Sequence, residues 1–173
     1  FEHRLLISWG EKINSAGEAF GYNNDYLAFI PLDASGRGGI LWSNHEYPSP
    51  LFLSGVAEGD PNVTKEQIRK QRVAVGGGLL RIRQDDSGQW KPVFGDRYNR
   101  RITGETPIRM AAPRAIMGSR TAIGTLGNCA GGVTPWQTVL TCEENYQEFY
   151  GEAVYENGKR KLVPSAYFWE KHF

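Results

Sequence analysis

The sequence predicts a mostly β fold with one short helix. Glycine occupies 21 and proline 9 of the 173 positions, so frequent turns divide the chain into short segments. These segments are rich in aromatic and β-branched residues, which favour strands. Two turns, Asp85-Asp86-Ser87-Gly88 and Asn157-Gly158, have sequences typical of hairpins, because glycine and asparagine tolerate positive φ angles.

The strands can be placed in chain order between these turns. Residues 26–32 are apolar at both alternating sets of positions, so we expect this strand to be covered on both faces. The helix is expected over residues 64–75, where Thr64 and Gln67 form a capping box. The expected strands span residues 4–9, 26–32, 40–43, 79–84, 89–94, 152–156 and 159–163.

Buried strands combined with polar outer hairpins fit a β-propeller. A β-sandwich gives the same local signals, and no sequence repeat of propeller length is visible. The chain is long enough for one sizeable core. Because it begins with Phe1 and its last residues, 167–173, read like the middle of an element, we expect it to be an incomplete part of a longer protein.

Charge and hydropathy exclude two classes of partner. The 20 basic and 19 acidic residues give a net charge of +1, too balanced for the basic surface of a nucleic-acid-binding protein. No apolar run approaches the roughly 20 residues of a membrane span. We therefore expect no nucleic acid partner and no membrane span.

Polar clusters at the ends of apolar runs carry the functional signal. They lie at residues 23–25, 43–46 and 142–145. Asn44 and Glu46 share one face of a strand, whereas His45 points to the other face. Two adjacent carboxylates, Glu143 and Glu144, repel each other unless a cation lies between them. The clusters predict bound cations, although a polar strand end and a solvated acidic loop explain the same residues.

The two cysteines allow several interpretations. Cys129 precedes Gly131-Gly132, where the absence of side chains lets backbone approach a ligand, and a thiolate is an effective metal ligand. Alternatively, Cys129 pairs with Cys142 in a disulfide, or either cysteine is a small buried residue. Cys142 follows an apolar strand, so we expect it to be buried. The cysteines lack the spacing of a zinc site.

Several sequence blocks, in this order along the chain, resemble the PhoX-type alkaline phosphatases. The block from Gly124 to Asn145 is long and unusual enough to be the most specific. The blocks are Ile7-Ser8-Trp9-Gly10, Gly21-Tyr22-Asn23-Asn24-Asp25-Tyr26, Asn44-His45-Glu46-Tyr47, Asn99-Arg100-Arg101-Ile102, Gly124-Thr125-Leu126-Gly127-Asn128-Cys129-Ala130-Gly131-Gly132, Pro135-Trp136 and Leu140-Thr141-Cys142-Glu143-Glu144-Asn145.

This resemblance implies a periplasmic or secreted phosphatase that hydrolyses small phosphate monoesters or diesters. It implies a six-bladed β-propeller with ferric iron and calcium in its channel. Residues 1–173 would form the N-terminal blades of a single propeller domain. The rest of the propeller, or associated fragments, would complete the fold, and this segment alone is expected to be inactive.

The resemblance also implies roles for individual residues. Cys129 would ligate iron, and Glu46, Glu143 and Glu144 would supply carboxylates that converge on the metal cluster. Asn44 and Asn24 would be ligands or hydrogen-bond partners of the ligands, and no catalytic residue is assigned. The alternatives are a non-catalytic calcium-stabilised propeller module and a propeller hydrolase like the calcium lactonases, the latter of which would not need Cys129.

Overall fold

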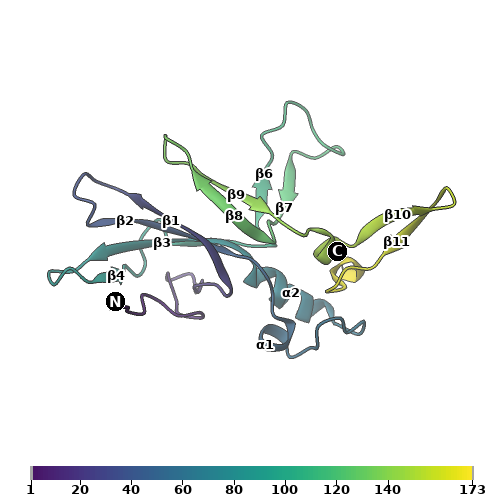
Figure 1. Ribbon diagram of the computed structural model, residues 1–173, viewed down its shortest axis with the longest axis horizontal. Helices are drawn as coiled ribbons and strands as arrows, with labels where there is room; N and C mark the ends of the chain where they lie inside the picture. Colours follow the sequence, from purple (N-terminus) through teal and green to yellow (C-terminus); the bar gives the residue numbers. More distant parts are fainter. Residues whose placement is uncertain (1, 173) are drawn as a thin grey trace.

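The computed structural model describes residues 2–172 and shows a mostly β fold with few helices (Figure 1). Antiparallel pairing joins all of its named strands. The strands are β1 (Asn24–Pro31), β2 (Gly38–His45), β3 (Gly76–Gln84), β4 (Trp90–Pro92), β5 (Arg100–Ile102), β6 (Pro107–Arg109), β7 (Thr121–Ile123), β8 (Asn128–Val133), β9 (Val139–Glu143), β10 (Glu152–Glu156) and β11 (Lys159–Val163). The helices are α1 (Pro50–Ser54), α2 (Lys65–Ala74), α3 (Gln147–Tyr150) and the 3-10 helix η1 (Trp169–His172).

The largest sheet contains five strands and positions half of the candidate site. Its order is β1-β2-β3-β4, and β5 pairs with β3 as well. The other strands form three separate hairpins, β6–β7, β8–β9 and β10–β11. Figure 1 shows the β8–β9 hairpin standing over the sheet near β1 and β2, while β10–β11 extends from the opposite side of the molecule. Contacts with β1 and β2 tie β8 to the sheet.

Two strands carry a β-bulge. In the first sheet, Asn24 lies opposite His45 and Leu27 lies opposite Ser43, so β1 holds one extra residue between these pairs. In the hairpin, Asn128 lies opposite Glu143 and Gly131 lies opposite Thr141, so β8 holds one extra residue as well. A bulge bends its strand and redirects the neighbouring side chains. The redirected residues include Asp25 and Cys129.

Glycines allow close packing on both sides of the central strands. A Cβ atom at Gly131 would lie 2.3 Å from the Tyr26 ring, so glycine lets β8 approach β1 at this point. A Cβ atom at Gly77 would lie 2.5 Å from the Trp42 indole. On the other face of the sheet, the His45 imidazole fills the space beside Gly21, where a Cβ atom would lie 2.6 Å from the ring. Gly77 of β3 and Gly21, which precedes β1, thus leave room for the Trp42 and His45 side chains of β2.

The core consists of two clusters of buried side chains. One cluster lies beneath the sheet and contains Ile13, Phe20, Leu80 and Ile82. The other joins α2, the entry to β8, α3 and η1. Its buried members are Val63, Ile68, Val75, Leu126, Phe149, Tyr167 and Trp169. Trp169 also donates a 2.8 Å hydrogen bond from its indole nitrogen to Gln71. Within residues 2–172, no helix has the length and apolar character needed to cross a membrane.

The local predictions from turn and cap sequences are confirmed. The β10–β11 hairpin has the expected bounds, with Asn157 at φ 52° and Gly158 at φ 73° in its turn. Helix α2 begins with the expected capping box, in which the Thr64 side chain accepts from the Gln67 N–H and the Gln67 side chain accepts from the Thr64 N–H. The β3–β4 hairpin also forms, although β4 has only three residues.

Four other expectations are wrong. Residues 4–9 contain no strand, because no neighbouring strand pairs with them in the described part of the chain. The strand expected at 26–32 is not covered on both faces. It is β1, the outermost strand of its sheet, and Leu27 is 54% exposed. Helices α1, α3 and η1 were not expected, because four or five residues are too few to show helical periodicity. Cys142 is exposed rather than buried, because its strand lies in a two-stranded hairpin that does not cover it.

Replacing Gly131 with alanine should destabilise the protein by about 1–3 kcal/mol, because the added methyl group would overlap the Tyr26 ring. Gly132→Ala is the matched control, since no atom lies within 4 Å of a Cβ atom at that position. Its free energy of unfolding should stay within about 0.5 kcal/mol of the wild-type value. Urea unfolding measures both differences. Equal stability of the two variants would contradict the packing of β8 on β1.

Candidate metal centre

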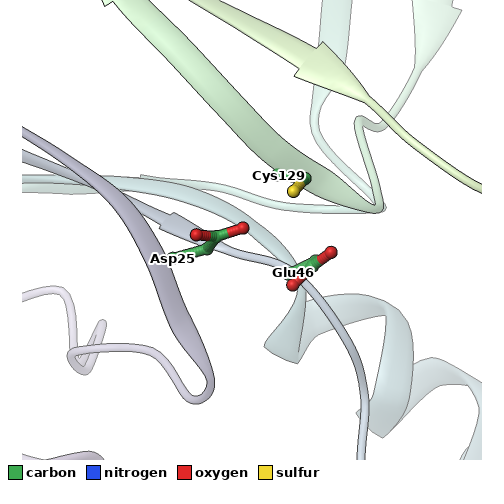
Figure 2. A group of neighbouring side chains, drawn as sticks. All are labelled: Asp25, Glu46 and Cys129. Atoms are coloured by element: carbon green, nitrogen blue, oxygen red, sulfur yellow. The ribbon is translucent and has the colours of Figure 1, made fainter.

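Three side chains from three separate segments meet above the sheet. One carboxylate oxygen of Asp25, one of Glu46 and the Sγ atom of Cys129 all lie within 4.8 Å of one another. Figure 2 shows that they approach a common point from β1, from the end of β2 and from the start of β8. Two hard oxygen donors and a soft sulfur donor at this spacing can bind a cation together.

The backbone around each residue explains this convergence. Asp25 and Cys129 belong to the bulged segments of β1 and β8, which face each other across the site. Glu46 is the first residue after β2, and its N–H donates a 3.0 Å hydrogen bond to the carbonyl of Asn23. This bond holds the end of β2 beside the start of β1. Glu46 therefore stays close to Asp25 although its strand has ended.

A third acidic residue, Glu144, reaches the same thiol from the end of β9. Its N–H donates to the carbonyl of Gly127 at 2.8 Å. Gly127 has φ 58°, and a Cβ atom there would lie 2.4 Å from the Glu144 carbonyl oxygen, so this contact needs glycine. Asn145 then turns the chain with φ 52° and donates a 2.7 Å hydrogen bond to the Tyr47 hydroxyl. The Glu144 carboxylate is thereby placed within hydrogen-bonding reach of Cys129.

Negative charge dominates the electrostatics of this cluster. The pKa of the Cys129 thiol is raised, first because it hydrogen-bonds to Asp25 and Glu144, and further because the Glu46 charge is near. Partial burial raises the pKa of Glu46, as do the charges of Asp25 and Glu144, while a hydrogen bond from Cys129 acts in the opposite direction. Within residues 2–172, none of the ion pairs involves Asp25, Glu46 or Glu144. The residues therefore fit a cation, which would reverse these shifts.

Not all of the residues expected at the metal cluster lie in this group. The Glu143 carboxylate accepts a 3.2 Å hydrogen bond from the N–H of Leu126, so it supports the loop before β8. Asn44 is fully buried and donates to the carbonyl of Cys129. Asn24 is exposed, and its side-chain oxygen accepts a 3.0 Å hydrogen bond from Ser43. Glu46 and Glu144 both lie beside Cys129, whereas the Glu143 carboxylate bonds to the Leu126 backbone.

His45 lies on the opposite face of β2, as the alternating pattern predicts. Its ring meets Phe20 edge-on at 5.3 Å between centroids, and its Nδ1 donates to the Tyr22 carbonyl at 3.0 Å. Burial and the nearby Arg101 charge lower the pKa of His45 to about 3, so the imidazole is neutral. Cys129 and Cys142 are both free thiols, which excludes the disulfide between them.

Asp25 is the residue of this group that the sequence reasoning missed. Its neighbours Asn23 and Asn24 mark a polar cluster before an apolar run, but alternation along a regular strand cannot place Asp25 beside Glu46. The bulge in β1 changes the facing of residues between Asn24 and Leu27. The polar cluster at residues 23–25 indicates that this segment contributes to a site. It does not show that Asp25 is the residue that reaches it.

Comparison with known proteins assigns the family. The chain belongs to the PhoX alkaline phosphatase family, whose profile, "Alkaline phosphatase PhoX", matches residues 1–172. The solved structure of "Pseudomonas fluorescens PhoX in complex with vanadate, a transition state analogue" superposes with a TM-score of 0.75 at 31% sequence identity. The match covers 86% of this chain and 29% of that one, so this chain spans less than a third of its relative's length. No curated protein sequence matches the chain.

In metal-free protein, iodoacetamide should modify Cys142 faster than Cys129 at about pH 8. The thiolate is the reactive form, and neighbouring carboxylates raise the pKa of Cys129, so less of it is ionised than an ordinary thiol at this pH. Cys142 serves as the internal control because it is exposed. Mass spectrometry of the two peptides over time gives both rates. Faster modification of Cys129 would contradict the carboxylate-lined thiol.

Proposed function

We propose that the full-length protein is a metal-dependent phosphatase that hydrolyses phosphate monoesters at an iron and calcium cluster. Asp25, Glu46, Cys129 and Glu144 are the ligands that this chain contributes. The observation that carries the proposal is the approach of two carboxylates and a thiol to within 4.8 Å. Family membership supports the class of reaction.

The charge of the site supports a role for cations in binding the substrate. A phosphate monoester is an anion, and it would be repelled by carboxylates that have no positive partner. When bound, metal ions supply the positive charge that neutralises phosphate oxygens and lowers the barrier to attack on phosphorus. The residues of this chain hold that charge at one place, with oxygen donors suited to calcium or ferric iron.

Cys129 distinguishes this proposal from the alternatives. Calcium takes oxygen ligands, so neither a structural calcium site nor a calcium-dependent lactonase site explains a thiol among the carboxylates. A soft sulfur ligand fits a transition metal such as iron. Its position inside the acidic group, in contact with Asp25 and Glu144, argues for a mixed cluster.

The larger architecture and the cellular location are part of the same proposal. Residues 1–173 are the N-terminal blades of a β-propeller, and the rest of the protein supplies further ligands and the groups that bind phosphate. Exposed apolar side chains on the hairpins, such as Trp136 at 75% and Tyr155 at 72% exposure, would then be covered by later parts of the chain. The protein acts in the periplasm or outside the cell.

The full-length protein should hydrolyse p-nitrophenyl phosphate when iron and calcium are supplied, and a chelator should abolish the activity. Glu144→Gln removes a charge beside Cys129 and should lower kcat/KM by about 10–100-fold, with weaker metal binding. Release of nitrophenol and metal analysis of the purified variants measure both effects.

Glu143→Gln is the matched control, because its amide oxygen can still accept the hydrogen bond from Leu126. It should keep kcat/KM within about threefold of wild type. Activity that survives complete metal removal would contradict the proposal. Equal losses in the two variants would show that Glu144 has no special role in the cluster.

A further inference from the structure

We propose that Asn44, together with Trp42 and Thr141, is a positioning clamp that holds the Cys129 thiol over the carboxylates. This inference rests on the proposed metal centre, because the clamp acts through Cys129. In this proposal Asn44 positions the ligand Cys129 and does not bind the metal itself. The clamp joins β2 of the large sheet to both strands of the β8–β9 hairpin.

The first contact of the clamp lies at the bulge in β8. Cys129 has no paired partner on β9, so the ladder does not fix its position. The Asn44 Nδ2 atom donates a 2.6 Å hydrogen bond to the Cys129 carbonyl oxygen. Asn44 is fully buried, so water does not compete for this bond. A side chain of β2 thus replaces the missing ladder contact.

Two donors fix the orientation of the Asn44 amide. Its Oδ1 atom accepts a 2.8 Å hydrogen bond from the Trp42 indole nitrogen and a 3.0 Å bond from the Thr141 hydroxyl. A carbonyl oxygen has two lone pairs, and both are used. The amide nitrogen must therefore face Cys129. A metal at Asn44 would have to displace one of these donors.

The Trp42 end of the clamp is fixed by packing. The indole is 7% exposed and lies on Gly77, where any Cβ atom would approach it to 2.5 Å. The ring therefore fits only because β3 has glycine at this position. Gly77, which is far from Cys129 in the sequence, thereby determines where the Trp42 indole and the Asn44 oxygen lie.

The Thr141 end makes a second link to the same bulge. The Thr141 hydroxyl accepts a 3.2 Å hydrogen bond from the side chain of Asn128, the buried residue just before Cys129. Thr141 therefore holds the Asn128 side chain, and Asn44 holds the carbonyl of the next residue, Cys129. Glu46 follows Asn44 by two positions, just past the end of β2, so β2 helps to position both a carboxylate and the thiol. Residues that orient metal ligands typically change metal affinity by 10–100-fold when they are replaced.

Ferric iron titration of the metal-free full-length protein, followed by visible absorption, tests the clamp. Thr141→Val removes the hydroxyl at constant shape and should weaken iron binding by about 10–100-fold. Thr141→Ser keeps the hydroxyl and should bind iron like the wild type. Thr138→Val is a control on the same hairpin, because the Thr138 side chain is exposed. Trp42→Phe removes the second donor and should weaken binding in the same direction.

The melting temperature of each metal-free variant separates positioning from folding. Thr141→Val and Thr138→Val should melt within a few degrees of each other while differing in iron affinity. The clamp would be overturned if Thr141→Val bound iron with unchanged affinity, or if Thr141→Ser failed to restore the affinity. It would also be overturned if the loss of affinity in Thr141→Val came with a comparable loss of thermal stability. Cys129→Ser tests the metal centre on which the clamp depends. If Cys129→Ser bound iron like the wild type, the metal centre itself would be refuted. If Cys129→Ser lost iron affinity while Thr141→Val kept it, the clamp alone would be refuted.

Discussion

The contact between the bulge of β1 and the bulge of β8 is the constraint on which the rest of the site depends. Regular pairing would leave Asp25 and Cys129 on strands whose side chains follow simple alternation. The extra residue in each strand redirects these side chains toward the space between the strands. The close approach itself requires Gly131, because any side chain there would meet the Tyr26 ring.

This arrangement concentrates like charges in a way that folding alone does not favour. Three carboxylates surround one thiol. Partial burial and then the charges of Asp25 and Glu144 raise the pKa of Glu46, and hydrogen bonds to Asp25 and Glu144 raise the pKa of Cys129. Structural ion pairs elsewhere, such as that between Arg69 and Glu105 at 3.5 Å, place a base beside each acid. Among residues 2–172, Asp25, Glu46 and Glu144 take part in no ion pair of this kind. A cation bound as proposed would offset the repulsion among these acids.

Features that depend on local sequence could be predicted, and features that depend on strand pairing could not. The Asn157-Gly158 hairpin and the Thr64 cap follow from the conformations that those residues favour. The family blocks drew attention to Cys129, Glu46 and Glu144, and the structure places these three residues near one another. The sequence did not single out Asp25, and it could not show that the Glu143 carboxylate accepts from the Leu126 N–H. A bulge or a strand end changes the facing of a side chain without any mark in the sequence. The exposure of β1 could not be predicted either, because an apolar edge strand and an apolar central strand have the same sequence pattern.

X-ray absorption at the iron edge of the full-length protein detects the atoms bound to the metal. We expect a sulfur atom among the iron ligands. That sulfur signal should disappear in Cys129→Ser and persist in Cys142→Ser, since only Cys129 lies beside Asp25 and Glu46. An iron environment of oxygen and nitrogen atoms alone in the wild-type protein would contradict this expectation.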